Sequence, residues 1–524
     1  MSVIKNPILK GFHPDPSIIR VNDDYYVATS TFEWFPGVMI HHSKDLCNWR
    51  PLNSPLNRES LIDLRGIPSS GGVWAPCLSY SNDTYFLAYS NVKNHDGLYW
   101  HVDNYLTTTK DIQGQWSDPI FLHSEGFDPS FFHDEDGRTW LVFQYLNYGE
   151  SKEGIKLQEF SLEKKELIGP VSTIFTGSKL GSAEGPHLYK MHGYYYLIVA
   201  EGGTGLGHAV TVARSHSIWG PYEVDPATPL MSSRDNPLLQ LQKAGHADLV
   251  NTPAGEWYMV HLVGRPLPSR GLCTLGRETA IQKVLWNEEG WLCLAHGGSE
   301  PAMLVEPPML QEHPWPLMPS RDHFDELILN PVYQTLRISL GQDKLSLVDR
   351  PGYLRLKGRD MLNSLFQQSF VARRVGSFHY TAITCLEFEP TGAKQMAGLT
   401  CYYNDKCFHY LRISLRDGIG KCLDIVTSDN GIYHFPIGTP VSLNNEKRIY
   451  LRANVKYDQL QYSYSCNSEN WIIAGPILDA GILSDEYANG WAFTGSFVGI
   501  CCQDLSGRGG YADFDYFEYV EHEE

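Results

Sequence analysis

The sequence lacks the features that mark membrane proteins and small secreted scaffolds. No stretch approaches the 18 apolar residues that a spanning helix needs, and residues 1–16 lack the apolar core of a secretory signal. The 11 cysteines are scattered, odd in number and without the spacing of a zinc site, so no disulfide framework is expected. We therefore expect a cytoplasmic protein with no membrane partner.

Positive charge is also scarce. Lys and Arg total 42 against 60 Asp and Glu, which gives a formal net charge of −18. A nucleic-acid backbone or an anionic membrane surface would be repelled by such a chain, so neither is expected as a partner. A neutral ligand fits this charge better.

Long alanine-rich helical stretches are missing as well. Instead the chain holds 30 Tyr, 22 Phe and 13 Trp, while 47 Gly and 31 Pro recur at short intervals between alternating segments. This pattern predicts an all-β protein. At 524 residues the chain is too long for one ordinary core, so two or three domains are expected.

Five segments begin alike. They are PDPSII, WAPCLSY, FDPSFFHD, EGPHLYK and GHADLVN, and aligning the apolar residues that follow makes positions 15, 75, 128, 185 and 246 equivalent. After each opening come three or four short strands separated by turns such as Asn82-Asp83 and Asp136-Gly137, which are strong hairpin signals. Repeats of three or four antiparallel strands at 53 to 61 residues predict propeller blades.

The composition divides the chain into three parts. Residues 1–299 hold the five repeats and predict a five-bladed β-propeller. Residues 300–319 are proline-rich without periodicity and are interpreted as a linker. Residues 320–524 return to alternating strands without the repeated opening, which predicts a β-sandwich.

Three of the five openings carry a carboxylate at or beside the equivalent position. These are Asp15, Asp128 and Glu184, and the first strand of every propeller blade lines the central channel, so the three acids should converge. Three nearby acids cannot all be ionised cheaply, so at least one pKa should rise, as a general acid–base pair requires. A cation site and a structural role in the channel stay open as alternatives.

Seven ordered motifs carry a resemblance to a known family. They are FHPDPSI, TSTFEWFPGV, GGVWAP, GFDPSFFHD, EGPHLY, GHADLV and LGRETA. Together they resemble glycoside hydrolase family 43, in particular its two-domain β-xylosidases, from Asn6 to Tyr519. The resemblance implies a catalytic propeller, a β-sandwich that closes the active-site pocket, and hydrolysis with inversion at the anomeric carbon.

The resemblance also implies roles for the acids. Asp15 matches the general base that activates water, Glu184 the general acid that protonates the leaving oxygen, and Asp128 the acid that orients Glu184 and raises its pKa. An inverting pair needs about 6.5–9.5 Å between its carboxyls to admit water, which two blades across a channel can provide.

Further positions match a sugar pocket by the same resemblance. Arg277 is similar to an arginine that hydrogen-bonds the terminal sugar, although a surface ion pair with Glu278 is the alternative. His246 matches an axial histidine beneath the site, or else a packed core residue. The resemblance also implies that three aromatic residues form walls of the pocket, the last of them contributed by the second domain: Phe32, Trp74 and Phe497.

The expected substrates are xylo-oligosaccharides and arabinose-bearing glycosides, cleaved from their ends. A dedicated α-L-arabinofuranosidase and a catalytically silent sugar-binding propeller are the alternatives, and the presence of all three acids disfavours the latter. The loops 144–155 and 264–276 are shorter than expected for this group, which bears on leaving-group preference. Members with this architecture often assemble, so a homo-oligomer, a dimer or tetramer, is expected.

No cofactor is expected to be required. One possible calcium site lies in the second domain, where three carboxylates recur in RDHFDE and DFDYFEY: Asp322, Asp325 and Asp515. Solvated surface carboxylates are the alternative interpretation of these residues.

Overall fold

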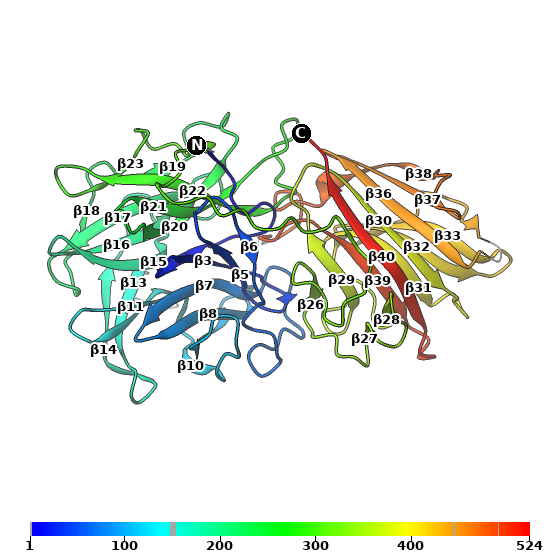
Figure 1. Cartoon of the computed structure of the whole chain (residues 1–524), viewed down its shortest axis with the longest axis horizontal. Coiled ribbons are helices and arrows are strands. Elements are labelled where there is room, and N and C mark those ends of the chain that lie inside the picture. The colour runs from blue at the N-terminus through cyan, green and yellow to red at the C-terminus, as the bar shows by residue number, and fades with distance from the viewer. Residues whose placement is uncertain (1–2, 147–153, 444–445, 491, 524) are drawn as a thin grey trace.

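The chain folds into two β-structured halves, seen side by side in a computed structural model (Figure 1). The structure describes residues 3–146, 154–443, 446–490 and 492–523. In these residues one three-residue 3-10 helix, η1 (Ala480–Ile482), is the only helical segment, and no helix is long and apolar enough to cross a membrane. The predicted all-β class is confirmed.

Five four-stranded antiparallel sheets form the first half, one for each repeat. Each sheet runs in chain order from its inner strand outward, except that an extra strand, β19 (Met231–Ser232), joins the fourth blade. The predicted five-bladed propeller is therefore confirmed. The blades are β2 (Ser17–Val21), β3 (Asp24–Thr29), β5 (Met39–Ser43) and β6 (Arg50–Pro51); β7 (Gly72–Ser81), β8 (Thr84–Asn94), β9 (His101–Thr109) and β10 (Ile120–His123); β11 (Gly126–His133), β12 (Thr139–Tyr145), β13 (Gly154–Ser161) and β14 (Glu166–Phe175); β15 (Glu184–Met191), β16 (Tyr194–Glu201), β17 (Ala209–Ser215) and β18 (Glu223–Val224); β20 (Gln242–Asn251), β21 (Trp257–Gly264), β22 (Arg277–Trp286) and β23 (Leu292–Leu294).

The five equivalent positions of the repeat share an unusual backbone conformation. All five are left-handed, with φ values between 35° and 56°. Non-glycine residues rarely adopt this conformation, and in strand pairs it produces a bulge that re-aims the neighbouring side chains. The register indeed shifts at this point in blades two to five. The positions are Asp15, Ala75, Asp128, Gly185 and His246.

The fourth of these positions requires glycine for a second reason. A Cβ atom on Gly185 would lie 2.9 Å from the imidazole ring of His246. Real side chains do not approach that closely, so the fourth blade presents only backbone here. Its carboxylate comes from Glu184, one residue earlier, which is the offset seen in the sequence alignment.

Two large sheets pack face to face in the second half, as the sequence predicts for a β-sandwich. One contains β34 (Ile432–His434), β33 (Gly420–Asp429), β32 (Cys407–Arg416), β31 (Gln395–Asn404), β39 (Phe497–Asp504), β29 (Ser369–Arg374) and β26 (Gln334–Leu336), with β35 (Val441–Ser442) beside β33. The other contains β27 (Leu345–Ser346), β28 (Leu354–Lys357), β40 (Tyr511–Glu521), β30 (His379–Phe388), β36 (Arg448–Lys456), β37 (Gln459–Ser465) and β38 (Ile472–Asp479), with β25 (Arg321–Asp322) beside β40.

The two halves share a sheet. Strand β4 (Trp34–Phe35) belongs to the first repeat in sequence, yet it pairs with β26 and so extends a sheet of the sandwich. A buried aromatic cluster surrounds this junction and contains residues of both halves, including Trp34 and Phe370. An ion pair with N–O distance 2.5 Å joins Lys243 of the propeller to Glu486 of the sandwich. Together these contacts fix how the second half sits over the propeller.

The proline-rich linker is not devoid of secondary structure. Within it, β24 (Leu304–Val305) pairs with β1 (Ile4–Lys5) near the N-terminus. The side-chain amide of Asn6 donates to the carbonyls of Ile281 and Ala302 at 2.8 Å each. The start of the chain and the linker are thus tied to the fifth blade. All eleven cysteines are free thiols.

Candidate active site

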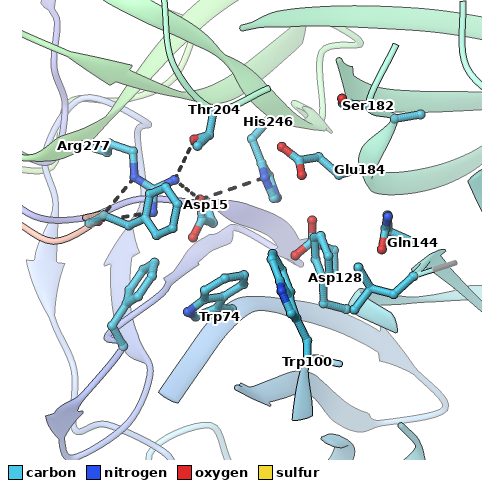
Figure 2. Close-up of a pocket in the computed structure, with 15 residues that line it drawn as sticks. Asp15, Trp74, Trp100, Asp128, Gln144, Ser182, Glu184, Thr204, His246 and Arg277 are labelled. Carbon is cyan, nitrogen blue, oxygen red and sulfur yellow. Dashed lines mark hydrogen bonds and ion pairs between the residues drawn. The ribbon is translucent and has the colours of Figure 1, made fainter. Parts of the chain in front are cut away.

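A cavity of about 290 Å³ opens at the end of the propeller channel where the sandwich half approaches (Figure 2). Its walls come from all five propeller blades and from one loop of the sandwich. Seven of its lining residues are sequence-predicted site residues: Asp15, Phe32, Trp74, Asp128, Glu184, His246 and Arg277. The structure therefore brings together groups that are up to 262 positions apart in the sequence.

The three acids meet because of the repeated backbone turn. Asp15 and Asp128 occupy left-handed positions at the strand openings of blades one and three, and Glu184 precedes the left-handed Gly185 in blade four. Figure 2 shows their carboxylates pointing toward a common space. Asp15 and Asp128 are 6% and 7% exposed, so their charges are poorly solvated and interact strongly.

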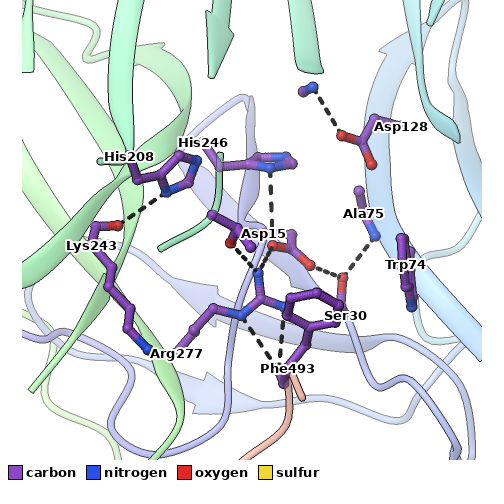
Figure 3. A network of polar contacts seen from close by, with 12 residues as sticks. Asp15, Ser30, Trp74, Ala75, Asp128, His208, Lys243, His246, Arg277 and Phe493 are labelled. Atoms are coloured by element: carbon purple, nitrogen blue, oxygen red, sulfur yellow. Dashed lines mark hydrogen bonds and ion pairs between the residues drawn. The ribbon is translucent and has the colours of Figure 1, made fainter. Parts of the chain in front are cut away.

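Both carboxylate oxygens of Asp15 are engaged (Figure 3). The Ser30 hydroxyl donates to Oδ2 at 2.6 Å, and Arg277 Nη1 lies 3.2 Å from Oδ1. Ser30 Oγ in turn accepts from the backbone N–H of Ala75 at 2.7 Å. The carboxylate is therefore held in one orientation by groups from blades one, two and five.

Glu184 has a different environment. Within the described residues, no hydrogen bond or ion pair engages its carboxylate, which leaves the carboxyl available to the cavity. Burial, and then the charge of Asp15, raise the Glu184 pKa from 4.5 to about 7, while Arg277 opposes the shift. Near neutral pH this carboxyl can hold a proton, as a general acid must.

Asp128 lies in the cavity near Glu184 (Figure 2). Its Oδ2 accepts the backbone N–H of Gly185 at 2.9 Å, so it fixes the peptide that directly follows Glu184. Burial, followed by the charges of Glu184 and Asp15, raises the Asp128 pKa well above its ordinary value. The mutual repulsion of the two carboxylates therefore disfavours their simultaneous ionisation.

Arg277 is part of the cavity and not a surface residue. Glu278, its sequence neighbour, is paired with Arg265 at 2.6 Å instead. Arg277 Nη1 donates to Thr204 Oγ1 at 2.9 Å as well as to Asp15, and its Nε and Nη2 donate to the carbonyl of Phe493 at 3.4 and 3.3 Å. One guanidinium thus joins the carboxylate, the cavity wall and the sandwich half.

His246 lies in the channel directly beside Asp15. Its Nδ1 is 3.9 Å from Asp15 Oδ1, and its ring packs against the backbone of Gly185. Burial lowers the His246 pKa to about 4, so the imidazole is neutral at physiological pH. It therefore adds a polar floor to the cavity without adding charge.

Aromatic rings form the remaining walls, with one correction to the sequence prediction. Phe32 and Trp74 line the cavity, but Phe497 does not. Phe497 begins β39, is 0% exposed and stacks on Trp34 with ring centroids 3.7 Å apart. The sandwich residue that lines the cavity is Phe493, four positions earlier in the same segment. The prediction that Phe497 lines the cavity was wrong. Phe497 lies in a strand and faces the core, whereas the loop before that strand reaches the cavity with Phe493.

Several residues of the site were not identified from the sequence. Ser30 lies among other hydroxyl residues in TSTF, where nothing distinguishes it. The others lie in loops or at strand ends: Trp100, Phe127, Gln144, Leu146, Ser182, Ala183 and Thr204. Only for Trp100 did the sequence offer a signal, namely an aromatic residue in the Gly- and Asp-rich segment that ends there. Residues 147–153 of the shortened loop lie outside the described residues.

The possible calcium site in the sandwich does not assemble. Asp515 forms an ion pair with Arg448, and Asp322 accepts the backbone N–H of Phe324 at 2.9 Å. In the part of the chain that the structure describes, no group of three or more His, Cys, Asp or Glu residues is arranged to hold a metal ion. Asp325 is exposed, so these three carboxylates are better explained as surface and ion-pair groups.

Comparison with known proteins matches both halves of the chain. Residues 4–292 match the family described as Glycosyl hydrolases family 43, and residues 321–520 match the Beta xylosidase C-terminal Concanavalin A-like domain. The chain is 46% identical to Beta-xylosidase of Bacillus subtilis and 45% identical to Xylosidase/arabinosidase 43B of Humicola insolens, over 99% or more of every chain. The crystal structure of xylan beta-1,4-xylosidase from Bacillus halodurans C-125 is similar with 51% identity and a TM-score of 0.97, covering 99% of this chain and 100% of that one.

Proposed function

The chain belongs to glycosyl hydrolase family 43, and from this premise we propose that it is an inverting exo-glycosidase. Its substrates are the non-reducing ends of β-1,4-xylo-oligosaccharides, from which it releases D-xylose, and it also cleaves α-L-arabinofuranosides. The observation that carries the proposal is the pairing of two unlike carboxyls in one cavity. Asp15 is fixed beside a guanidinium, whereas Glu184 has a pKa of about 7 and no partner among the described residues.

Asp15 acts as the general base in this mechanism. Its carboxylate is oriented by Ser30 and Arg277, so its remaining lone pairs can accept a proton from a water molecule beside the anomeric carbon. That water attacks the face of the sugar opposite to the leaving group, and the configuration inverts. Arg277 also places a positive charge directly beside this carboxylate.

Glu184 acts as the general acid. It protonates the glycosidic oxygen as the bond to the anomeric carbon breaks, which avoids the departure of a free alkoxide. Asp128 is the positioning residue of this acid. By accepting the N–H of Gly185 it holds the backbone beside Glu184, and its proximity disfavours a second negative charge there.

The shape of the cavity supports exo action. Phe493, from the sandwich half, and Arg277 stand together at one side of the cavity, with the guanidinium carbon 5.3 Å from the ring centroid. A boundary on one side of the site favours a terminal sugar over a continuing chain. Phe32, Trp74 and His246 complete the surface that would contact that sugar.

The second candidate is a dedicated α-L-arabinofuranosidase. The name of the Humicola insolens relative includes both activities, and the two sugars present similar hydroxyl geometry to one pocket. The deciding experiment compares kcat/KM on matched aryl β-D-xyloside and aryl α-L-arabinofuranoside. Proton NMR of the first product anomer tests inversion: α-xylose must appear first from a β-xyloside, and β-xylose first would overturn the mechanism.

Three further points stay proposals from the sequence. No cofactor is required, because the two carboxyls supply both proton transfers. The protein is expected to act in the cytoplasm on imported oligosaccharides. It is also expected to form a homo-oligomer, a dimer or a tetramer.

A further inference from the structure

Ser70 occupies a junction between the two halves of the molecule. It lies just before β7, is 2% exposed and has a left-handed backbone with φ of 64°. Glycine adopts this conformation at a lower free-energy cost than serine, so the backbone conformation gives no reason for a serine at position 70. The hydroxyl group therefore calls for a separate explanation.

All three polar groups of Ser70 are used, each for a different part of the structure. Its N–H donates to Oε2 of Glu33 at 3.1 Å, and its carbonyl accepts the indole N–H of Trp74 at 2.9 Å. Its hydroxyl oxygen accepts the backbone N–H of Phe493 at 3.0 Å. Glu33 directly precedes β4, the strand that joins the propeller to the sandwich sheet.

Two of these partners are neighbouring parts of the cavity wall. Trp74 comes from the propeller and Phe493 from the sandwich, and their ring centroids are 5.8 Å apart with the planes at 84°. One residue thus binds both walls by direct hydrogen bonds. These hydrogen bonds connect the two walls in addition to the general packing of the two halves.

The same connection continues to the catalytic base. The carbonyl of Phe493 accepts from Nε and Nη2 of Arg277, and Nη1 of Arg277 contacts Asp15 (Figure 3). The chain of contacts therefore runs from Glu33 through Ser70, Phe493 and Arg277 to Asp15. Docking of the sandwich onto the propeller and the placement of the base are joined by this path.

We propose that Ser70 is a positioning residue whose hydroxyl holds the Phe493 loop against the propeller and so sets the position of the Phe493 ring beside Trp74 in the wall of the sugar site. Through it, the second half of the molecule becomes part of the sugar site. This inference rests on the proposed function, because it concerns the binding of the terminal sugar. It assigns Ser70 to substrate affinity and not to proton transfer.

The test uses two substitutions that both remove the Ser70 hydroxyl. Ser70→Gly relieves the left-handed backbone, whereas Ser70→Ala retains it, so the glycine variant should have the higher Tm of the two. Both should raise KM for an aryl β-D-xyloside and the Kd for D-xylose, measured calorimetrically, by about three- to tenfold. Ser468→Gly is the matched control, since Ser468 has the same φ of 64° on an exposed loop, and it should change neither constant.

A purely structural role makes a different prediction. If Ser70 served stability alone, the glycine variant would bind D-xylose like the wild type, and that result would overturn the proposal. Combining Ser70→Gly with Phe493→Ala sharpens the test: once the ring is absent, loss of the hydroxyl should add less than twofold to Kd. A fully additive loss would contradict action through Phe493.

Failure of the proposed function would be visible separately. A wild-type protein that binds D-xylose but hydrolyses neither aryl glycoside would overturn the glycosidase assignment, while the Kd values would still decide the role of Ser70. Wild-type activity together with unchanged Kd values in both Ser70 variants would overturn only the inference about Ser70.

Discussion

Arg277 and Asp15 form a buried ion pair at the centre of the cavity, with Nη1 3.2 Å from Oδ1 and side-chain exposures of 6% and 7%. Removing one member of such a pair leaves an unpaired buried charge, which costs about 3–5 kcal/mol of stability. Substitutions of Asp15 therefore test catalysis cleanly only if they retain the shape and a hydrogen-bond acceptor for Arg277.

Asp15→Asn is accordingly the preferred test of the general base. Asparagine tolerates the left-handed backbone at φ 54° and can still accept from Arg277, but it cannot take a proton from water. We expect kcat on an aryl β-xyloside to fall by about 10²–10⁴-fold with little change in KM. Turnover within threefold of the wild type would contradict the assignment of Asp15.

Glu184→Ala tests the general acid through the leaving group. Protonation matters most when the departing alcohol is a poor leaving group, so kcat/KM on xylobiose should fall about 10²–10⁴-fold. On a dinitrophenyl xyloside, which leaves without help, the loss should be less than about tenfold. Equal losses on both substrates would show that Glu184 does not donate the proton.

The raised pKa of Glu184 predicts a basic limb in the pH profile. Because the acid must be protonated, kcat/KM on xylobiose should decline as the pH rises through about 7. On the dinitrophenyl substrate the decline of kcat/KM with rising pH should be much weaker. A limb on xylobiose lying above pH 9 would contradict the assignment.

The same shift has a consequence for stability. A carboxyl whose pKa rises from 4.5 to about 7 on folding does not destabilise the folded state below pH 4.5. As the pH rises from there to about 7, its ionisation progressively lowers the free energy of unfolding. Glu184→Gln removes a buried charge of this kind, worth about 3 kcal/mol at most. Thermal unfolding should show the variant gaining Tm over the wild type at pH 8 but not at pH 4.5.

Ser30→Ala should damage the base without touching the substrate. It removes the donor to Asp15 and leaves the Ala75 N–H unpaired, which costs about 1–3 kcal/mol of stability. We expect kcat to fall about ten- to a hundredfold as the carboxylate loses its orientation. Ser17→Ala is the control, because Ser17 makes the same pair of contacts, to Asp248 and the N–H of Leu78, outside the cavity lining. Equal kcat losses in both variants would refute a specific role for Ser30.

Phe493 and Phe497 should respond oppositely to truncation. Phe493→Ala removes a cavity wall and should raise KM by about tenfold or more with little loss of Tm. Phe497→Ala empties a fully buried site and should cost about 3–5 kcal/mol, with KM nearly unchanged in the protein that remains folded. Kinetics and thermal unfolding of the two variants check this directly, and the reverse pattern would restore Phe497 as the cavity residue.

The propeller could be predicted because its signals are local and repeated. Each blade has its own turn and its own opening, and the alignment of five openings located the positions that prove to be left-handed. The convergence of Asp15, Asp128 and Glu184 followed from that alignment alone. Their roles required the resemblance to a family, because spacing does not distinguish an acid from a base.

Contacts between the halves could not be predicted in this way. The pairing of β4 with β26 joins Phe35 to Thr335, 300 positions away, and no periodicity in either segment indicates it. The choice between Phe493 and Phe497 depends on which residue precedes the strand, and strand boundaries are uncertain by a few residues from sequence alone. Ser30 and Ser70 act through single hydroxyl groups, which leave no pattern at all.

Strand β4 also limits how this protein can be divided by engineering. A cut in the linker would separate the chain into two fragments of plausible size, but the propeller fragment would carry away two residues of the neighbouring sheet, Trp34 and Phe35. The sandwich fragment would keep an unpaired edge at β26 and an uncovered apolar surface, a combination prone to aggregation. Chimeras that exchange the second half between relatives should therefore transplant Glu33–Pro36 with it, so that the inherited unit is discontinuous in sequence.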